Sequence, residues 1–416
     1  MRVLISGAEI AGPTLAWFLA RTGWRVTVVE RASSILSHGQ NVDLHASAVT
    51  VIKRMGLFDE LKRNHTGERG TQFVNSKGSP YARFPAGDGA ASPTSEFEIL
   101  RGDLARLLYK ATADHPNIEY QFSTTVKQIV SNDDQSVKVE FSHGGNQEYD
   151  LLVAADGQWS KIRKQAFPPD SVTVVDKGMF AVYWTTERLP DDNDWWNVYF
   201  SGKSKLVSLR PDPYNTIRAM FTCMPRTDDH KKEWLEASKS DEETQRSFLR
   251  REFSEVGWQA GRLLQTMDEA PDFYFQAVQQ IRMSDWSVGR VVCLGDAGYA
   301  PTPLTGAGTS LAVIGAYVLA GELGKLGPSQ HPSTALKEYQ TIFKPYVEQE
   351  QNIPFFVPGI AHPDTATKKW LVENLMWLVA KIVSLPFLKG TPGQQEDDGF
   401  KLPSYTTLES STDKVS

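Results

Sequence analysis

The start of the chain alternates between short apolar runs and helical spacing. Residues 2–6 form a short, nearly continuous apolar run, which predicts a strand covered on both faces. From Pro13 to Gly23 the apolar residues recur at helical spacing, and proline suits a first helical turn because that turn needs no N–H. A second apolar run, residues 25–29, ends at Glu30. The pattern predicts a strand–helix–strand unit and therefore an α/β fold.

The remaining pattern predicts one nucleotide-binding domain that is interrupted by a smaller sheet domain. Residues 171–225 alternate like antiparallel strands and are rich in aromatic residues. Further helices are expected at residues 46–62, 102–113, 242–255 and 309–323, and further strands within 70–100, 118–155 and 290–294.

Two apolar segments imitate targeting or membrane sequences. Glu9 interrupts residues 1–20, which resolve into a strand, a turn and a helix, so we expect mature structure there. Residues 370–388 contain Glu373, Asn374 and Lys381, which favours a helix docked on the protein body over one that crosses a bilayer. A helix lying on a membrane surface remains the alternative.

Composition narrows the function classes. The 416 residues carry a net charge of −6, whereas nucleic-acid binders usually show a strong basic bias. The two cysteines, Cys223 and Cys293, indicate neither a disulfide framework nor a clustered metal site, and the 8 His lack metal-ligand spacing. We expect a cytoplasmic protein without nucleic-acid partners, stable membrane insertion or bound metal, as a monomer or homodimer.

The turn after the first strand carries the pattern Gly7-Ala8-Glu9-Ile10-Ala11-Gly12. In a dinucleotide fingerprint the first Gly makes the tight turn, the second admits a pyrophosphate, and the third lets helix and strand pack closely. Glu30 stands where an acidic side chain accepts the ribose hydroxyls. Because Glu9 replaces the second Gly, an ordinary loop remains an alternative to a site in which Glu9 points aside or towards the ribose.

Two further Gly-containing turns follow apolar strands. Asp156-Gly157 comes after residues 151–155, and Gly295-Asp296 comes after residues 290–294. The second turn continues through a Pro- and Gly-rich loop into the helix at 309–323, whose N-terminus stabilises negative charge. Taken singly, each motif could be an ordinary turn.

Taken together, these motifs resemble a known family. The Gly-rich turn with Glu30, the stretch Arg101-Gly102-Asp103-Leu104, and the Asp156-Gly157 and Gly295-Asp296 turns occur in the order typical of class A FAD-dependent monooxygenases of the para-hydroxybenzoate hydroxylase type. The resemblance covers roughly residues 1–350. Residues 39–45 look most like the tetracycline-inactivating monooxygenases, and the chain is also similar to fungal monooxygenases of secondary metabolism.

The resemblance implies roles for individual residues. Glu30 would hold the adenosine ribose, Arg101 the phosphates or the ribityl region, and Asp296 the ribityl or pyrophosphate portion. Asp43 would lie by the flavin, and residues 306–309 would place backbone N–H groups near the flavin N1 and C2 carbonyl. The implied FAD-binding residues are Gly7, Glu9, Ala11, Gly12, Glu30, Arg31, Gln40, Asp43, Arg101, Leu104, Asp156, Gly157, Asp296, Pro303, Gly306, Gly308 and Thr309.

Three positions depart from the family pattern. Glu9 replaces a Gly, Ala155 stands where relatives often carry Gly, and Leu36 stands where the tetracycline-type enzymes have a basic residue that contacts the reductant. The last difference leaves the docking of NAD(P)H open. His45 lies near the proposed flavin segment, where a helix-entry or surface role is the favoured interpretation.

The resemblance also implies a reaction. NAD(P)H would reduce FAD, O₂ would add to give a flavin C4a-hydroperoxide, and the substrate would be hydroxylated or epoxidised, in secondary metabolism or xenobiotic modification. The cofactor carries the chemistry, so no protein residue is assigned as catalytic. The abundant aromatic residues favour an aromatic or polycyclic substrate.

Candidate substrate contacts lie on the central antiparallel strands. They are Phe180, Tyr183, Trp184 and Arg210. Alternation sends Phe180 and Trp184 to one face and Tyr183 to the other, so all three can line a pocket only if a bulge intervenes. A place in the sheet core remains the alternative for Tyr183.

The motif positions imply interleaved domains. A Rossmann-like FAD-binding domain is expected from residues 1–70, 101–170 and 281–350, and an inserted antiparallel substrate-binding sheet from 71–100 and 171–280. A C-terminal helical segment is expected at 351–390 and a loose tail at 391–416.

Other functions remain possible on this fold. A flavin halogenase would carry a Trp-x-Trp-x-Ile-Pro motif, which Trp195-Trp196 does not supply. A flavoprotein reductase, or a redox-inactive FAD- or ligand-binding protein with a degenerate turn at Glu9, is the alternative.

Overall fold

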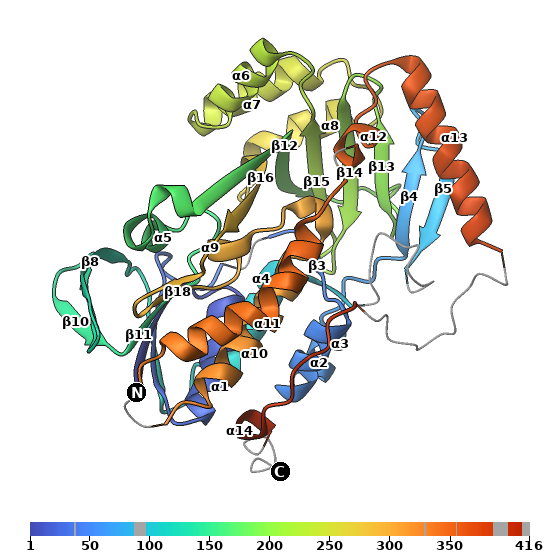
Figure 1. Cartoon of the computed structure of the whole chain (residues 1–416). Helices are drawn as coiled ribbons and strands as arrows, with labels where there is room; N and C mark the ends of the chain where they lie inside the picture. Colours follow the sequence, from blue (N-terminus) through green and yellow to red (C-terminus); the bar gives the residue numbers. More distant parts are fainter. Residues whose placement is uncertain (37–38, 87–96, 328–329, 355, 386–397, 410–416) are drawn as a thin grey trace.

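A computed structural model describes residues 1–36, 39–86, 97–327, 330–354, 356–385 and 398–409. Two large sheets form its framework, and a short two-stranded ribbon lies between them (Figure 1). Segments that are far apart in sequence build each sheet, so the predicted mixed α/β fold is confirmed.

The first sheet contains the predicted strand–helix–strand unit. Its order is β17-β18-β11-β1-β2-β7, and all neighbours run parallel except β17 and β18. β1 and β11 are almost completely buried, as parallel strands covered on both faces require. The strands are β1 (Arg2–Ser6), β2 (Arg25–Val29), β7 (Ile118–Gln121), β11 (Leu151–Ala154), β17 (Ser287–Val288) and β18 (Val291–Cys293).

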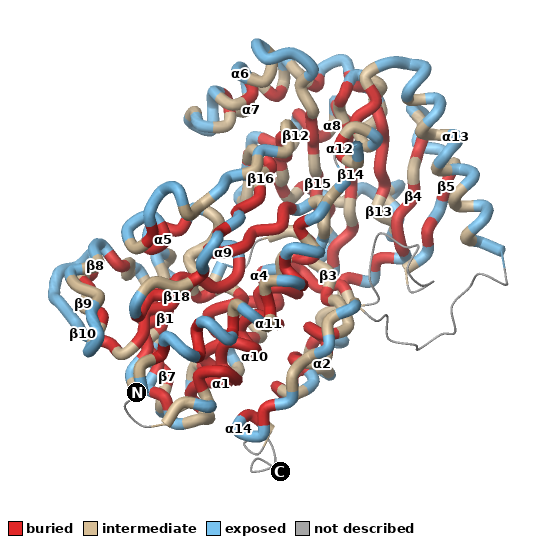
Figure 2. Tube along the Cα trace, viewed as in Figure 1, coloured by how far each residue is buried: buried red, intermediate tan, exposed pale blue. Residues whose placement is uncertain are grey.

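Helices cover this sheet. The central one, α10 (Gly308–Leu323), is apolar on all sides and contacts α1 (Ala11–Arg21), α2 (Ala46–Arg54) and α11 (Ser333–Gln351). Figure 2 shows the buried core running through α1, α10 and the adjacent strands. Because α10 is enclosed, its first turn has a fixed position relative to the carboxyl ends of the strands.

The second sheet has the order β16-β12-β15-β14-β13-β4-β5. Its neighbours run antiparallel except β13 and β4, which run parallel. An apolar cluster joins one of its faces to three helices, α6 (Asp228–Ala237), α7 (Glu242–Phe253) and α8 (Ala260–Thr266). The strands are β4 (Gly70–Val74), β5 (Pro80–Pro85), β12 (Val172–Glu187), β13 (Trp196–Phe200), β14 (Lys205–Pro211), β15 (Thr216–Cys223) and β16 (Tyr274–Met283).

A ribbon of two short strands lies between the first and the second sheet. β3 (Asn41–Asp43) pairs antiparallel with β6 (Glu98–Leu100), and α4 (Arg101–Lys110) follows directly. Glu98 therefore belongs to this ribbon and does not extend the second sheet, although residues 71–100 were assigned to that sheet. The predicted meander forms a separate small sheet of β8 (Val126–Asn132), β9 (Val137–Phe141) and β10 (Asn146–Tyr149).

The helix expected over residues 46–62 is in fact two helices. α2 ends near Gly56, whose φ of +73° is a left-handed conformation that stops a helix, and α3 (Phe58–Arg63) follows. Apolar periodicity continues across the break and therefore did not reveal it. The short helices are α5 (Lys161–Ala166), α9 (Asp296–Tyr299), α12 (Val357–Ile360) and α14 (Thr406–Glu409).

The apolar C-terminal segment forms α13 (Ala366–Val383), which packs along the edge strand β5 (Figure 1). Val372 and Met376 join an apolar cluster there, whereas Trp370 and Leu378 on the outer side are exposed. No helix in the described part of the chain is long and apolar enough to cross a membrane.

The expectation of a loose tail is wrong for residues 398–409. The Asp398 carboxylate accepts hydrogen bonds from the Ser47 backbone N–H and hydroxyl, both at 2.8 Å. Tyr405 is 3% exposed and donates to Glu322 on α10 at 2.7 Å. These buried contacts fix the segment, and polar composition alone did not predict them. The rest of the expected tail lies outside the described residues.

Candidate functional site

The turn between β1 and α1 depends on two glycines. Gly7 has a φ of +114°, and a Cβ added to it would lie 2.2 Å from the carbonyl oxygen of Ala155. A Cβ on Gly12 would lie 2.0 Å from the carbonyl oxygen of Gly7. Helix α1 can therefore approach the turn only if both side chains are absent, as the fingerprint requires.

Glu30 braces this turn from the end of β2. Its carboxylate accepts hydrogen bonds from the backbone N–H of Ala8 at 3.0 Å and of Ala32 at 2.9 Å. A carboxylate offers about four acceptor sites, so Glu30 can still accept from hydroxyl groups. This arrangement suits a ligand polyol such as a ribose.

Glu9, the departure from the fingerprint, is paired with Arg101. The Glu9 carboxylate lies 3.3 Å from Arg101 Nη2, and both side chains are about half exposed, at 46% and 48%. Arg101 begins α4, and its backbone N–H donates to the Gln40 carbonyl at 3.0 Å. The structure thus brings Glu9, Gln40 and Arg101 together at the mouth of the turn.

Asp296 follows the end of β18 and lies near Glu9 and Arg101. Asp296 is exposed to solvent, but the many protein atoms around its carboxyl desolvate that group and so raise its pKa. Arg101 opposes that rise in pKa and Glu9 adds to it, so both charges lie near Asp296. Gly295, with a φ of +64°, allows the chain to turn from β18 into α9.

The loop before α10 is held in an unusual backbone conformation. Thr302 has a φ of +93°, and its hydroxyl is buried without a hydrogen-bond partner in the described structure. Gly306 has a φ of +67°, and a Cβ added there would meet no atom within 4 Å. Open space therefore lies beside Gly306, two residues before α10 begins, and the first N–H groups of that helix lack helical partners.

Residues 43–45 are anchored to this first turn. The Ser310 hydroxyl accepts from the His45 backbone N–H at 2.9 Å and donates to the Asp43 carbonyl at 3.4 Å. His45 occupies the N-cap position of α2, which agrees with the expected helix-entry role. These hydrogen bonds therefore hold the segment that carries Asp43 against the first turn of α10.

Asp156 has a structural role as well as an unused acceptor. One carboxylate oxygen accepts from the Lys161 backbone N–H at 3.0 Å and so supports the start of α5. The other oxygen is buried and has no partner among the described residues. Burial raises the pKa of the carboxyl. A contact between Asp156 and the dinucleotide remains a prediction.

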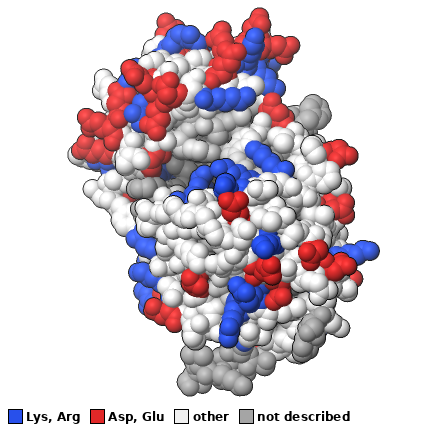
Figure 3. All heavy atoms as spheres, turned by 90° about the vertical axis from the view of Figure 1, so that its left-hand side faces the viewer, with Lys and Arg blue, Asp and Glu red and all other residues white. Residues whose placement is uncertain are grey.

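The residues at this site fit FAD. Glu30 suits a ribose, the β1–α1 turn and Arg101 suit phosphates, and the first turn of α10 suits negative charge on a flavin. Figure 3 shows the corresponding side of the molecule hollowed below the charged helices α6 and α7, with Lys and Arg at the edge of the hollow. One expected contact does not fit, because the Leu104 side chain is 0% exposed in the core.

The faces of β12 separate the candidate substrate contacts. Phe180 and Trp184 are 2% and 0% exposed and belong to the cluster under α6–α8. Tyr183 is half-buried on the other face, where it packs against a small cluster that contains Ala181, and Leu304 from the loop before α10 packs against the same cluster. The predicted alternation is confirmed, since the register shift in β12 occurs before Phe180.

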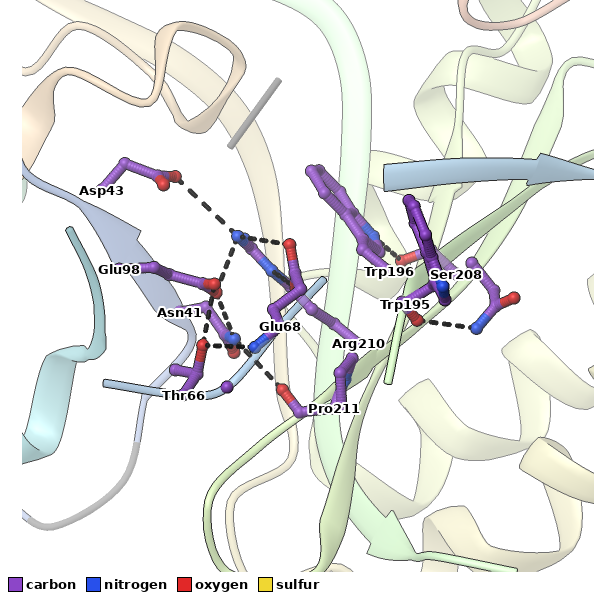
Figure 4. A network of polar contacts seen from close by, with 12 residues as sticks. Asn41, Asp43, Thr66, Glu68, Glu98, Trp195, Trp196, Ser208, Arg210 and Pro211 are labelled. Atoms are coloured by element: carbon purple, nitrogen blue, oxygen red, sulfur yellow. Dashed lines mark hydrogen bonds and ion pairs between the residues drawn. The ribbon is translucent and has the colours of Figure 1, made fainter. Parts of the chain in front are cut away.

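Arg210 lies in a dense polar network (Figure 4). Its Nε is 2.7 Å from a Glu68 oxygen, and its Nη2 is 2.7 Å from Glu98 and 3.9 Å from Asp43. The guanidinium carbon also stands 4.4 Å from the centre of the Trp196 ring. The side chain is 11% exposed. Sequence analysis missed Glu68 and Glu98, which have no local motif around them.

Sequence analysis also missed Tyr274. It begins β16 and is 48% exposed. Burial raises the pKa of its hydroxyl while Arg101 and Arg31 lower that pKa, so both arginines lie near Tyr274.

No group of three or more His, Cys, Asp or Glu suited to a metal ion occurs among the residues that the structure describes.

Comparisons with known proteins agree with this geometry. Residues 1–351 match the family described as FAD binding domain. A flavin-dependent monooxygenase from an unknown prokaryotic organism is 36% identical over 84% of this chain and 87% of its own length. The FAD-dependent monooxygenase asL6 of Sarocladium schorii is 32% identical over 98% and 99% of the two chains. The crystal structure of tetracycline destructase Tet(55) superposes with a TM-score of 0.77 at 31% identity, covering 97% and 98%.

Proposed function

This chain belongs to the FAD binding domain family and is an FAD-dependent monooxygenase, and we propose that it uses NAD(P)H and O₂ to oxygenate an aromatic or polycyclic small molecule. When bound, FAD supplies the redox chemistry: it accepts a hydride from NAD(P)H and activates O₂. A polycyclic substrate is supported by the similarity to tetracycline destructase Tet(55), and the biological setting that we propose is secondary metabolism or xenobiotic modification.

One observation carries the proposal. Glu30, Arg101 and Asp296 come from three separate parts of the chain, and the fold brings them to the β1–α1 turn, at the carboxyl ends of the parallel strands. The chain's own residues would bind the adenosine and phosphates there and orient the flavin against the first turn of α10.

The substrate would lie between this turn and the second sheet. Tyr183 and Leu304 both pack against the small apolar cluster of Met179, Ala181 and Val278 there, which supports a flat, apolar substrate. Enclosure by the sheet would keep water from the reacting centre.

The proposal is tested by O₂ uptake with FAD-loaded protein and each nicotinamide. We expect NADH or NADPH oxidation with O₂ uptake that an aromatic substrate stimulates, and one atom from ¹⁸O₂ in the product by mass spectrometry. Substrate-independent release of all the oxygen as hydrogen peroxide across a broad aromatic panel would contradict oxygenation.

A second function, a redox-inactive FAD-binding protein, draws on one observation. The pairing of Glu9 with Arg101 occupies a cation that would otherwise contact phosphates. FAD that neither nicotinamide reduces would favour this alternative.

The same pairing gives a prediction for FAD affinity. Glu9→Gly removes a negative charge and a side chain from the turn and frees Arg101, so FAD should bind more tightly. An exposed charge contributes up to about 1 kcal/mol, which corresponds to about a fivefold lower Kd. Fluorescence titration of the FAD-free protein measures it.

Glu9→Gln serves as the comparison, since it removes the charge and keeps the side chain. An intermediate Kd for Glu9→Gln would separate the two contributions. Equal or weaker FAD binding by Glu9→Gly would show that Glu9 does not oppose the cofactor.

A further inference from the structure

The network around Arg210 contains more acids than bases. Three carboxylates, on Glu68, Glu98 and Asp43, lie within 4 Å of the one guanidinium. The Glu68 and Glu98 side chains are 0% and 2% exposed, so water does not screen their charges. A buried cluster with this imbalance is favoured when one carboxyl carries a proton.

Glu98 has the donors that an ionised carboxylate needs. The Thr66 hydroxyl donates to it at 2.8 Å and Arg210 Nη2 lies at 2.7 Å, while the Asn41 amide donates to the same oxygen as Arg210 (Figure 4). By contrast, Glu68 accepts side-chain hydrogen bonds only from Arg210 within the described structure. The proton therefore belongs on Glu68.

The electrostatic environment of Glu68 agrees with this assignment. Burial raises the pKa of its carboxyl to about 8, and the charges of Glu98 and Asp43 add to the effect while Arg210 opposes it. These three, on β6, β3 and β14, are the charged groups that act on Glu68. Burial also raises the pKa of Glu98, against the pull of Arg210 and the hydrogen bonds from Asn41 and Thr66.

Arg210 also connects the β3–β6 ribbon to the second sheet. Asp43 and Glu98 stand directly opposite each other in the β3–β6 pair, where two like charges are destabilising unless a cation bridges them. Arg210 reaches both from β14 of the second sheet. The Asn41 amide also donates to the Pro211 carbonyl on β14 at 3.3 Å.

The β3–β6 ribbon is also connected to α10. The Asp43 carbonyl accepts from Ser310 in the first turn of that helix. A displacement of β14 would therefore reach Asp43 and the first turn of α10 through the β3–β6 ribbon.

We propose that Arg210 is a positioning residue: it holds the β3–β6 ribbon to the second sheet, fixes Asp43 beside the first turn of α10, and needs a proton on Glu68 to reduce the excess negative charge of the cluster. This inference rests on the proposed function, since Asp43 matters through the bound flavin. It differs from the expectation that Arg210 contacts the substrate, because Glu68, Glu98 and the Trp196 ring surround the guanidinium.

The proton on Glu68 is tested on the purified full chain by infrared difference spectroscopy between neutral and alkaline pH. We expect a protonated-carboxyl band that disappears with a midpoint near pH 8. Glu68→Gln, which has the shape of the protonated acid, should lack this transition. Glu233→Gln, at an exposed glutamate on α6, is the matched control and should keep it.

The free energy of unfolding should also depend on the protonation of Glu68. Because the pKa of Glu68 is higher in the folded than in the unfolded chain, the folded state holds the extra proton between the unfolded pKa and about pH 8. Stability therefore falls as pH rises through that window. Urea unfolding should show a pH slope that is one proton steeper in the wild type than in Glu68→Gln.

The positioning role is tested in the FAD-loaded protein by the visible absorbance and circular dichroism of the flavin. Arg210→Met, which keeps an unbranched apolar side chain and removes the guanidinium charge, should change both spectra and lower kcat for NAD(P)H oxidation at least tenfold with a smaller change in KM for the nicotinamide. Arg210→Lys should restore part of the loss. Should Arg210→Met fail to fold, Arg210→Lys and the wild-type flavin spectrum across pH 7–9 provide the readout.

Three results would overturn the inference. The first is an infrared transition that Glu68→Gln retains, and the second is the absence of that transition from the wild type. The third is an unchanged flavin spectrum in a folded Arg210 variant whose KM for an oxygenated substrate rises while kcat stays constant, which would make Arg210 a substrate contact. The infrared and unfolding measurements do not depend on turnover, so failure of the proposed function would be distinguishable.

Discussion

Gly12→Ala is expected to abolish FAD retention. The added Cβ would lie 2.0 Å from the Gly7 carbonyl oxygen and 3.2 Å from Ile5 Cγ2, so helix α1 must move away from β1. That movement opens the turn which receives the phosphates. Overpacking of this kind costs about 1–3 kcal/mol of stability, and the protein should remain folded. The measurement is the ratio of flavin to protein absorbance after gel filtration.

Gly261→Ala is the matched control. Gly261 lies on the exposed side of α8, and a Cβ added to it would meet no atom within 4 Å. The same substitution there should leave FAD content unchanged and favour the helix by up to about 1 kcal/mol. A folded Gly12→Ala protein that retains as much FAD as Gly261→Ala would contradict the proposed role of the turn.

Glu30→Ala is expected to weaken FAD binding by about 100-fold. The change removes the acceptor of the Ala8 and Ala32 backbone N–H groups and the proposed ribose contact. Hydrogen bonds to a charged group contribute about 1.5–3 kcal/mol each, and 2.7 kcal/mol corresponds to about 100-fold in Kd. Fluorescence titration of the FAD-free protein gives the Kd.

Glu119→Ala controls for the loss of a carboxylate near the same sheet edge. Glu119 lies on the neighbouring strand β7 and is exposed. This variant should bind FAD like the wild type. If Glu30→Ala and Glu119→Ala have the same Kd, the assignment of the ribose to Glu30 fails.

The strand–helix–strand unit and its turn were predictable because they depend on neighbouring residues. The apolar run before Gly7, proline in the first turn of α1 and the acid at the end of β2 each have a local physical reason. The sequence did not show that Glu9 pairs with Arg101, since 92 positions separate them.

The setting of Arg210 was not predictable for the same reason. Its partner Glu68 is 142 positions away, and no periodicity marks the residues between them. Alternation along β12 predicted the opposite faces of Phe180 and Tyr183, but it could not show which face α6–α8 would cover. Long-range pairing, rather than local pattern, decides such points.

Anaerobic reduction of the bound flavin tests the central claim most directly. The purified protein should show the visible flavin absorbance bands, NADH or NADPH should bleach them without oxygen, and admitting O₂ should restore them. A protein that shows no flavin bands after loading with FAD, or bands that neither nicotinamide bleaches with or without aromatic compounds, would contradict an NAD(P)H-dependent flavin monooxygenase.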